Sequence, residues 1–462
     1  MYLIKSISGI RGVVGGTQGN YLTPIDIVEC TSAYGHWIIA NKQAKKVVIG
    51  RDARISGKMV SQLVANTLTM MGINVVDLGL STTPTVEIAV PEENAGGGII
   101  LTASHNPKEW NALKFLNHKG EFISAQNGAD ILAFIEKKSY EFANVDQLGS
   151  YTKNSTYIEK HIDKIIRLPS VKQDLIRKKK FKIIVDCINS TGAKSIPPLL
   201  KSLSCEYELI NGDMHGDFAH NPEPLPANLT QLTDAVSNSD ADLGIIVDPD
   251  VDRLAFVCED GSMFGEEYTL VAIADYILKN DPGTAVSNLS STRALADVCR
   301  SHGVEYVPSA VGEVNVVEMM KKHHAKIGGE GNGGIIYPDL HYGRDALVGI
   351  ALFLSFLAES GLKVTDLRKK YPFYQMAKQK IQFTPEMDVN AILNHVKNQF
   401  SDEKVNTVDG VKIDFDEGWV HLRKSNTEPI IRLYAEAMDQ KTIDSLTNKI
   451  SMSLSDILGK TS

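Results

Sequence analysis

One serine of this chain follows a short apolar run in a context that suits ligand chemistry. Residues 99–101 are Ile-Ile-Leu, and residues 102–107 read Thr-Ala-Ser-His-Asn-Pro. The apolar run predicts a buried strand, and Asn-Pro marks a turn. Ser104 is therefore expected just past the carboxyl end of a strand, where open α/β sheets place their ligands. The alternative is an ordinary polar turn. His105 and Lys114 lie near the serine and could orient a phosphate or move a proton.

Three carboxylates follow a second apolar run. Asp248, Asp250 and Asp252 come directly after residues 243–247, and this spacing allows them to converge on one hard cation. Arg253 could hold a phosphate oxygen. Calcium binding of the EF-hand type is excluded, because Arg253 occupies the position where that loop needs glycine. A phosphatase that uses Asp248 as its nucleophile stays open. A solvated acidic turn is disfavoured, because the three carboxylates repel one another unless a cation neutralises them.

A glycine-rich loop, Gly-Glu-Gly-Asn-Gly-Gly, occupies residues 329–334. A dinucleotide-binding loop must open a helix, whereas residues 335–338 here are typical of a strand and a break. Glu330 and Asn332 could bind sugar hydroxyls, since they supply acceptors and a donor. A tight turn explains the glycines equally well.

A basic and polar segment, Arg-Lys-Ser-Asn-Thr-Glu-Pro, spans residues 423–429 between two strand-like runs, and Arg432 follows it. Its cations, hydroxyls, amide and backbone N–H groups favour a phosphate cradle over a polar hairpin.

Three repeated units must position these loops. Residues 46–50, 182–185 and 285–289 are apolar strands, each followed by a polar turn and a helix-like stretch. This repetition predicts an α/β protein of three similar domains with mixed or largely parallel sheets. The chain after Phe373 is typical of a smaller α+β domain. The predicted boundaries are 1–150 for the serine loop, 151–257 for the metal loop, 258–372 for the sugar loop and 373–462 for the phosphate cradle.

Composition excludes several classes of protein. The net charge of −8 argues against a general nucleic-acid binder. The five cysteines are scattered without a CxxC pair, which indicates reduced thiols and no zinc site. No apolar run is long enough to span a membrane. We therefore expect a cytoplasmic protein.

Taken together and in this order, the four motifs resemble those of the α-D-phosphohexomutase family, which includes phosphoglucomutase, phosphomannomutase and phosphoglucosamine mutase. The resemblance implies four domains around a central cleft, each supplying one loop. It implies that Ser104 is the phosphoserine and that Asp248, Asp250 and Asp252 bind one Mg²⁺ together with its phosphate.

The resemblance also assigns roles to residues that bind the substrate. Glu330 and Asn332 belong to the sugar loop by this comparison, and the non-reacting phosphate is held by Arg423, Ser425, Asn426, Thr427 and Arg432. Arg11, within residues 8–12, matches an arginine near the reacting phosphate. Lys114 matches a lysine proposed as the general base. A sugar bisphosphate is the implied activator and intermediate.

Two departures from the family pattern narrow the range of expected substrates. The sugar loop has Asn332, and Gly334 stands where many members have a histidine, so His341 or a water would have to substitute. The loop at residues 311–315 lacks a lysine that some phosphomannomutases use. Both departures resemble phosphoglucosamine mutases of the archaeal and Bacteroidetes type.

The sequence therefore predicts a mutase that interconverts glucosamine 6-phosphate and glucosamine 1-phosphate. The alternatives are a phosphomannomutase or phosphoglucomutase of the same family, the Asp248 phosphatase, and a non-catalytic sugar-phosphate sensor. We expect a hexose or hexosamine phosphate as the small-molecule partner, no nucleic-acid or membrane partner, and a monomer or homodimer.

Overall fold

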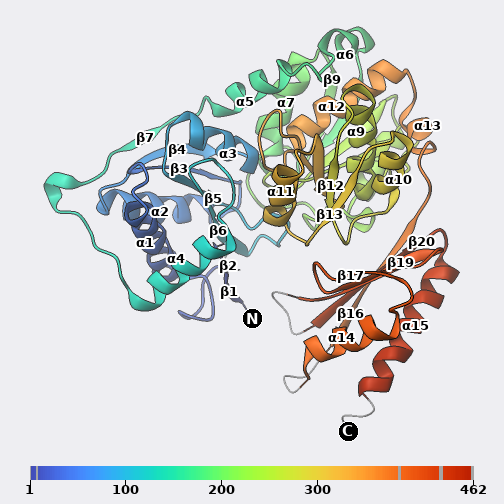
Figure 1. The fold of residues 1–462 in the computed structure, drawn as a ribbon. Helices are drawn as coiled ribbons and strands as arrows, with labels where there is room; N and C mark the ends of the chain where they lie inside the picture. Colours follow the sequence, from blue (N-terminus) through green and yellow to red (C-terminus); the bar gives the residue numbers. More distant parts are fainter. Residues whose placement is uncertain (1, 7–8, 383–386, 426–429, 459–462) are drawn as a thin grey trace.

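The computed structural model describes residues 2–6, 9–382, 387–425 and 430–458. Four sheets follow one another along the chain, and Figure 1 shows the first in blue and the last in orange and red. Three α/β units with mixed sheets precede a smaller unit with an antiparallel sheet, so the predicted fold class is confirmed.

The first sheet has seven strands in the order β1-β2-β6-β5-β3-β4-β7. Strands β5, β3, β4 and β7 are parallel, and β6 joins β5 antiparallel. Its strands are β1 Leu3–Ser6, β2 Gly9–Val13, β3 Lys46–Arg51, β4 Asn74–Leu80, β5 Gly97–Leu101, β6 Trp110–Leu116 and β7 Tyr151–Lys153. Its helices are α1 Pro24–Ala40, α2 Gly57–Met70, α3 Thr83–Glu92, α4 Ala125–Lys137 and the short η1 Val145–Gln147.

Strand β5 is buried along its whole length, because helices cover both faces of the sheet. Its two glycines allow those helices to pack closely. A Cβ at Gly97 would lie 2.1 Å from Tyr34 Oη of α1, and a Cβ at Gly98 would lie 2.7 Å from Val90 of α3. The predicted buried strand before the serine is confirmed, and its carboxyl end points at the candidate site.

The second and third sheets have four strands each, in the orders β11-β10-β8-β9 and β13-β12-β14-β15. The second unit contains α5 Tyr157–Ile166, α6 Gln173–Lys179, β8 Lys182–Asp186, α7 Gly192–Ser202, β9 Glu206–Ile210, η2 Pro226–Asn228, α8 Thr230–Ser237, β10 Leu243–Val247 and β11 Leu254–Cys258. The third contains α9 Glu266–Asn280, β12 Ala285–Asn288, α10 Ala294–Ser301, β13 Tyr306–Ser309, α11 Glu313–Lys322, β14 Ile327–Glu330, β15 Gly334–Ile336, α12 Ala346–Ser360 and α13 Val364–Arg368.

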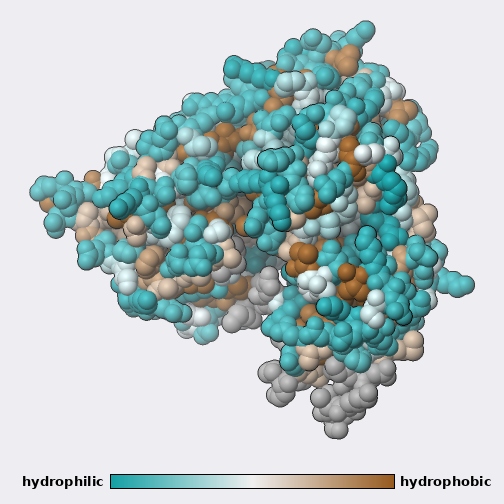
Figure 2. All heavy atoms as spheres, viewed as in Figure 1, coloured by the Kyte–Doolittle hydropathy of each residue, from teal (hydrophilic) through white to brown (hydrophobic). Residues whose placement is uncertain are grey.

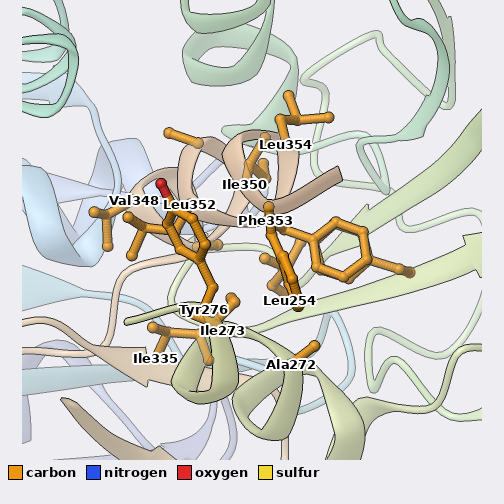
Figure 3. Close-up of a cluster of buried hydrophobic side chains, with 14 of the residues drawn as sticks. Leu254, Ala272, Ile273, Tyr276, Ile335, Val348, Ile350, Leu352, Phe353 and Leu354 are labelled. Atoms are coloured by element: carbon orange, nitrogen blue, oxygen red, sulfur yellow. The ribbon is translucent and has the colours of Figure 1, made fainter. Parts of the chain in front are cut away.

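The second and third units share one hydrophobic core. Helix α12 is apolar around its whole circumference and is buried from Ala346 to Ala358, as expected of a helix inside a protein core. Figure 3 shows Phe353 of this helix close to Leu254 of β11, with α9 below. The ring of Phe353 stacks on Phe256 of β11 at 3.8 Å between centroids. The metal loop and the sugar loop therefore extend from strands that pack on one continuous hydrophobic core.

The fourth unit is an antiparallel sheet of order β16-β20-β19-β18-β17, with α14 and α15 packed on it. Its elements are β16 Gln375–Gln382, α14 Val389–Gln399, β17 Lys404–Asn406, β18 Val411–Asp414, β19 Gly418–Lys424, β20 Ile430–Ala437 and α15 Gln440–Leu458. The face in Figure 2 is hollowed where the first, third and fourth units approach one another. None of the helices in the described part of the chain has both the length and the apolar character that crossing a membrane requires.

Candidate active site

The serine loop follows β5 and places Ser104 in a strained conformation. Ser104 has a φ of +49°, a left-handed geometry that costs an L-residue about 1–2 kcal/mol. Its backbone N–H donates to Thr102 Oγ1 at 2.9 Å, and the residue is only 6% exposed. The serine thus lies where the sequence predicts it, past the carboxyl end of a buried strand.

A buried arginine that the motif analysis missed holds this loop. Arg54 ion-pairs with Asp52 at 2.9 Å. Its guanidinium also donates to the carbonyl oxygens of Pro107 at 2.6 Å, Trp110 at 3.0 Å, Asn106 at 2.6 Å and Ser104. Arginine presents five donors in a fixed plane, so one side chain fixes four carbonyls of the serine loop. The sequence signal that could have identified Arg54 is its spacing from Asp52, directly after the predicted strand at residues 46–50.

The metal loop joins β10 to β11 and meets the serine loop. Ser104 Oγ donates to Asp248 Oδ2 at 2.8 Å, and Asp248 Oδ1 accepts the backbone N–H groups of Asp252 and Arg253 at 3.1 Å each. Thr83, at the start of α3, donates to Asp250 Oδ2 at 2.6 Å. The first two units of the chain are therefore joined at the candidate site itself.

The three carboxylates fit a divalent cation. All three residues have no exposed surface, and each offers a ligand atom within 4.8 Å of the others. Asp250 Oδ1 and Asp252 Oδ1 are buried and accept no hydrogen bond from any described residue. Burial and repulsion from Asp252 and Asp250 raise the pKa of Asp248 well above its usual value. A hard cation would relieve both the unpaired oxygens and the repulsion.

Cationic side chains surround the serine and the carboxylates. Lys114 Nζ lies 3.0 Å from Asp250 Oδ2, and although burial opposes it, this carboxylate and Asp252 raise the pKa of Lys114. Arg253 Nε is buried, lies 3.8 Å from Asp252 Oδ1 and has no hydrogen-bond partner among the described residues, so it can still donate to an anion. Arg11 Nη1 donates to Asn106 Oδ1 at 3.4 Å, and burial followed by the nearby Arg253 lowers the pKa of Arg11.

His105 is neutral in this environment. Its Nδ1 lies 3.5 Å from Ser104 Oγ. Burial and then the charges of Arg253 and Arg11 lower the pKa of His105 to about 2. The predicted phosphate-orienting role therefore requires the imidazole to act as a neutral hydrogen-bonding group.

Arg344 connects the metal loop to the sugar loop, and no motif pointed to it. Its guanidinium ion-pairs with Asp252 at 2.6 Å, Glu330 at 2.9 Å and Glu313 at 3.0 Å. Burial disfavours its charge, but these three carboxylates raise the pKa of Arg344 well above its usual value. The residue follows β15 and precedes α12, so only the folded chain brings it to Asp252.

The glycine-rich loop is the hairpin turn between β14 and β15, which confirms that it does not open a helix. Glu330 Oε1 accepts from Asn288 at 2.9 Å and from the backbone of Gly312 at 3.2 Å. Asn332 Nδ2 donates to Glu330 Oε2 at the longer distance of 3.4 Å. Burial alone would raise the pKa of Glu330, but Arg344 and then Arg253 lower it. Glu330 is thus an ionised acceptor held in place by its neighbours.

The fourth sheet carries a row of cations. Arg423 of β19 is paired in register with Arg432 of β20, which in turn is paired with Lys380 of β16. Paired residues of an antiparallel sheet lie on the same face, and these alternate with the core residues Leu422 and Leu433. The row therefore lies on the face opposite α14 and α15.

Like charges opposite one another destabilise a sheet, so a phosphate bound at the predicted cradle would offset the repulsion within this row. Arg423 Nε already donates to Asp409 at 3.0 Å, and Asp409 also accepts the backbone N–H of Val311. Ser425 is buried, whereas Asn426 and Thr427 lie outside the described residues.

His341, the residue expected to substitute for the missing family histidine, contacts two carboxylates. Its ring nitrogens are 3.3 Å from Glu87 Oε2 and 3.3 Å from Asp345 Oδ2. The structure therefore brings together Ser104, the three aspartates and their cations, connects them to Glu330 through Arg344, and places His341 in a separate cluster.

Models of four domains of one protein family match consecutive parts of the chain. They are phosphoglucomutase/phosphomannomutase alpha/beta/alpha domain I at residues 4–142, domain II at 159–261, domain III at 265–374, and the C-terminal domain at 376–451. The chain belongs to the phosphoglucomutase/phosphomannomutase family.

Relatives support this family membership over nearly the whole chain. A probable phosphoglucosamine mutase of Methanopyrus kandleri is 33% identical, covering 94% of both chains. A phosphoglucomutase/phosphomannomutase of Thermococcus kodakarensis is 32% identical, again covering 94% of each. The crystal structure of a phosphoglucomutase/phosphomannomutase family protein from Burkholderia thailandensis superimposes with a TM-score of 0.86 at 25% identity, covering 98% of this chain and 97% of that one.

Proposed function

We propose that this protein is a phosphosugar mutase that interconverts glucosamine 6-phosphate and glucosamine 1-phosphate through a phosphoserine at Ser104. The observation that carries the proposal is the contact of Ser104 Oγ with Asp248 Oδ2 at 2.8 Å, inside a buried group of three carboxylates. A hydroxyl at such a group is positioned to carry a phosphoryl group beside a divalent cation.

The proposed reaction has two matching halves. In the first, a sugar hydroxyl oxygen bonds to phosphorus while the bond from phosphorus to Ser104 Oγ breaks. Lys114 takes the hydroxyl proton, and a proton returns to Ser104 Oγ. The product is a sugar bisphosphate, which reverses its orientation in the cleft. In the second half, its other phosphoryl group moves to Ser104 by the reverse steps.

Positioning and charge neutralisation account for most of the catalysis in phosphoryl transfer. Asp248, Asp250 and Asp252 would hold Mg²⁺ together with the serine phosphate, and the bound ion neutralises charge on phosphate oxygens. Arg253 Nε makes only a long ion pair with Asp252 and no hydrogen bond to a described residue, which supports a phosphate contact. Lys114 is a cation beside Asp250, so it must lose its proton before it accepts one from the sugar.

Two loops are proposed to hold the rest of the substrate. The cation row of Arg423, Arg432 and Lys380 would bind the phosphate that does not react, together with Ser425, Asn426 and Thr427. Glu330 has about four acceptor positions and four donors near them. The long contact from Asn332 is the weakest of these, so we expect a sugar hydroxyl or ammonium group to replace it.

The preference for an amino sugar rests on Asn332, on Gly334 and on the Methanopyrus relative named as a probable phosphoglucosamine mutase. The Thermococcus relative is named a phosphoglucomutase/phosphomannomutase, which makes glucose and mannose phosphates the competing substrates. We further propose that the enzyme works in a reducing compartment, the cytoplasm, because all five cysteines are free and buried.

A phosphatase with Asp248 as its nucleophile is not favoured. Asp248 Oδ1 accepts two backbone N–H groups, and Oδ2 accepts the serine hydroxyl. A nucleophilic carboxylate would need one of these oxygens directed at the substrate, and the phosphatase would leave the position of Ser104 unexplained.

The proposal is tested by kcat/KM for the 1-phosphates of glucosamine, glucose and mannose, measured with Mg²⁺ and a trace of the matching sugar bisphosphate. Preference for glucosamine 1-phosphate, with the 6-phosphate as product, supports the full proposal. Equal or faster turnover of glucose or mannose phosphate refutes the amino-sugar assignment and leaves a mutase of broader specificity. Release of inorganic phosphate without isomerisation refutes the mutase.

A further inference from the structure

A second group of metal-ligating side chains lies apart from the three aspartates. His161 of α5 and the pair His341 and Asp345, just before α12, bring ligand atoms within 4.8 Å of one another. His161 and Asp345 have no exposed side-chain surface, and the His341 side chain is 13% exposed. The proposed phosphoryl transfer uses none of these three residues.

The two imidazoles converge on a single oxygen. His161 Nε2 lies 2.8 Å from Asp345 Oδ2, and His341 Nε2 lies 3.3 Å from the same atom. Ligand atoms of a tetrahedral ion bound at about 2.0–2.1 Å are about 3.3 Å apart. The contact of His341 Nε2 with Asp345 Oδ2 already has this length, and the contact of His161 Nε2 with the same oxygen would have to lengthen to admit an ion.

The opposite nitrogen of each imidazole faces an oxygen that can accept its proton. His161 Nδ1 lies 3.0 Å from Thr85 Oγ1, and His341 Nδ1 lies 3.3 Å from Glu87 Oε2. Metal-ligating histidines almost always donate their second N–H in this way, which fixes the ring and directs the lone pair of the other nitrogen at the metal. His161 is therefore already oriented as a ligand, and His341 has a carboxylate beside its outer nitrogen.

Two carboxylates complete the arrangement. Asp345 Oδ1 accepts the backbone N–H groups of Leu347 and Val348 at the start of α12, which leaves Oδ2 as its ligand atom. Glu87 is 2% exposed, and neither of its oxygens has a hydrogen-bond partner among the described residues. A proton held on His341 Nδ1 by metal binding at Nε2 would give Glu87 the partner it lacks.

The cluster also has an entry route. A cavity of about 300 Å³ is lined by Glu87 and His341 together with charged residues of the first and second units, among them Lys119 and Lys164. An ion can therefore reach His341 from solvent.

We propose that His161, His341 and Asp345 form a binding site for a divalent transition-metal ion of the zinc class, with Glu87 and Thr85 orienting the two imidazoles. Two imidazole nitrogens and one carboxylate oxygen are donors that favour zinc over magnesium. Because His341 lines the cavity, a fourth ligand would come from solvent.

The bound ion would cross-link the second and third units and hold the first through Thr85 and Glu87. Thr85 and Glu87 belong to α3, His161 to α5, and Asp345 caps α12. Helix α3 also carries Thr83, which bonds Asp250, and Asp345 follows Arg344, which pairs with Asp252. The ion would thus fix two supports of the metal loop without contacting the reacting groups.

Cobalt(II) is the probe for this site, because its absorption reports ligand geometry where zinc is silent. The full-length protein is stripped with a chelator and titrated with Co²⁺ in excess Mg²⁺, which occupies the three aspartates. We expect one Co²⁺ per chain, with visible absorption typical of a site of low coordination number, and a higher unfolding temperature on loading with Zn²⁺. Absence of Co²⁺ binding in excess Mg²⁺ overturns the proposal and leaves a hydrogen-bonded junction between domains.

Matched variants locate the ion. His161→Gln and His341→Gln should each weaken Co²⁺ binding by about 100-fold or more, since loss of an outer partner alone weakens binding 10–100-fold. His302→Gln is the control, because His302 pairs with Asp275 at 2.7 Å without a second imidazole, and its Co²⁺ affinity should not change. Unchanged binding in both cluster variants overturns the proposal.

A measurement on the unmodified protein covers the case in which the variants do not fold. X-ray absorption of the Zn²⁺-loaded enzyme should show two imidazole ligands. A shell of oxygen ligands alone would place the zinc at the aspartates and refute the site.

Discussion

Replacing Arg54 with lysine tests whether the serine loop is held in a strained, active geometry. Arg54 makes five hydrogen bonds, one to Asp52 and four to carbonyls between Ser104 and Trp110. Lysine has three donors, so at least two of these bonds are lost. At about 1.5–3 kcal/mol for each bond to a charged group, the loop loses about 3–6 kcal/mol of support.

This loss exceeds the cost of about 1–2 kcal/mol for the left-handed conformation of Ser104, so the loop should relax and displace the hydroxyl. If the lost energy appears in the transition state, kcat falls by about 10²–10⁴-fold. KM should change little, since Arg54 is buried and bonded to the backbone of the loop. The assay is steady-state kinetics of the Arg54→Lys variant with glucosamine 1-phosphate, after circular dichroism confirms folding.

The matched control is Arg51→Lys. Arg51 lies three residues earlier and donates to the carbonyl of Asp52 at 3.1 Å, with no described bond to the serine loop. Its kcat should stay close to that of the unmodified enzyme. A folded Arg54→Lys enzyme with unchanged kcat, or an equal loss in Arg51→Lys, would refute this account of the loop.

Three further predictions follow from other contacts of the site. Arg344→Met leaves the carboxylates of Asp252 and Glu330 buried without their cation, which should cost about 3–5 kcal/mol, measured by thermal unfolding; an unchanged melting temperature would contradict the bridging role. Burial lowers the pKa of His421 to about 4, so its contribution to stability is full above about pH 6.5 and is lost as pH falls through about 4. The His421→Asn variant should therefore show a weaker dependence of melting temperature on pH over this range. Identical pH profiles of the variant and the unmodified protein would argue against this role. Removal of divalent ions with a chelator should abolish isomerisation, Mg²⁺ should restore it, and Asp250→Asn should raise the Mg²⁺ concentration needed.

The loops were predictable because their signals are local. Ser104 and the three aspartates each follow a short apolar strand, and strands of this kind can be recognised from a few neighbouring residues. The turn after β14 was assigned correctly because residues 335–338 lack the helical pattern a nucleotide loop would need.

The residues that connect the loops were not predictable in the same way. Arg344 pairs with Asp252 across 92 positions of sequence, and Arg54 bonds carbonyls about 50 residues away. Lys380 joins Arg432 only through the pairing of β16 with β20. A lone cation carries no signal of its partner, because that partner is chosen by the packing of separate units.

The most direct test of the proposed mechanism is the location of the phosphoryl group on the enzyme. The protein is incubated with glucosamine 1,6-bisphosphate and Mg²⁺, and the modified residue is identified by peptide mass spectrometry. The account predicts one phosphoryl group on Ser104 that returns to added glucosamine 6-phosphate as bisphosphate. Labelling of Asp248, or full mutase activity in Ser104→Ala, would contradict it.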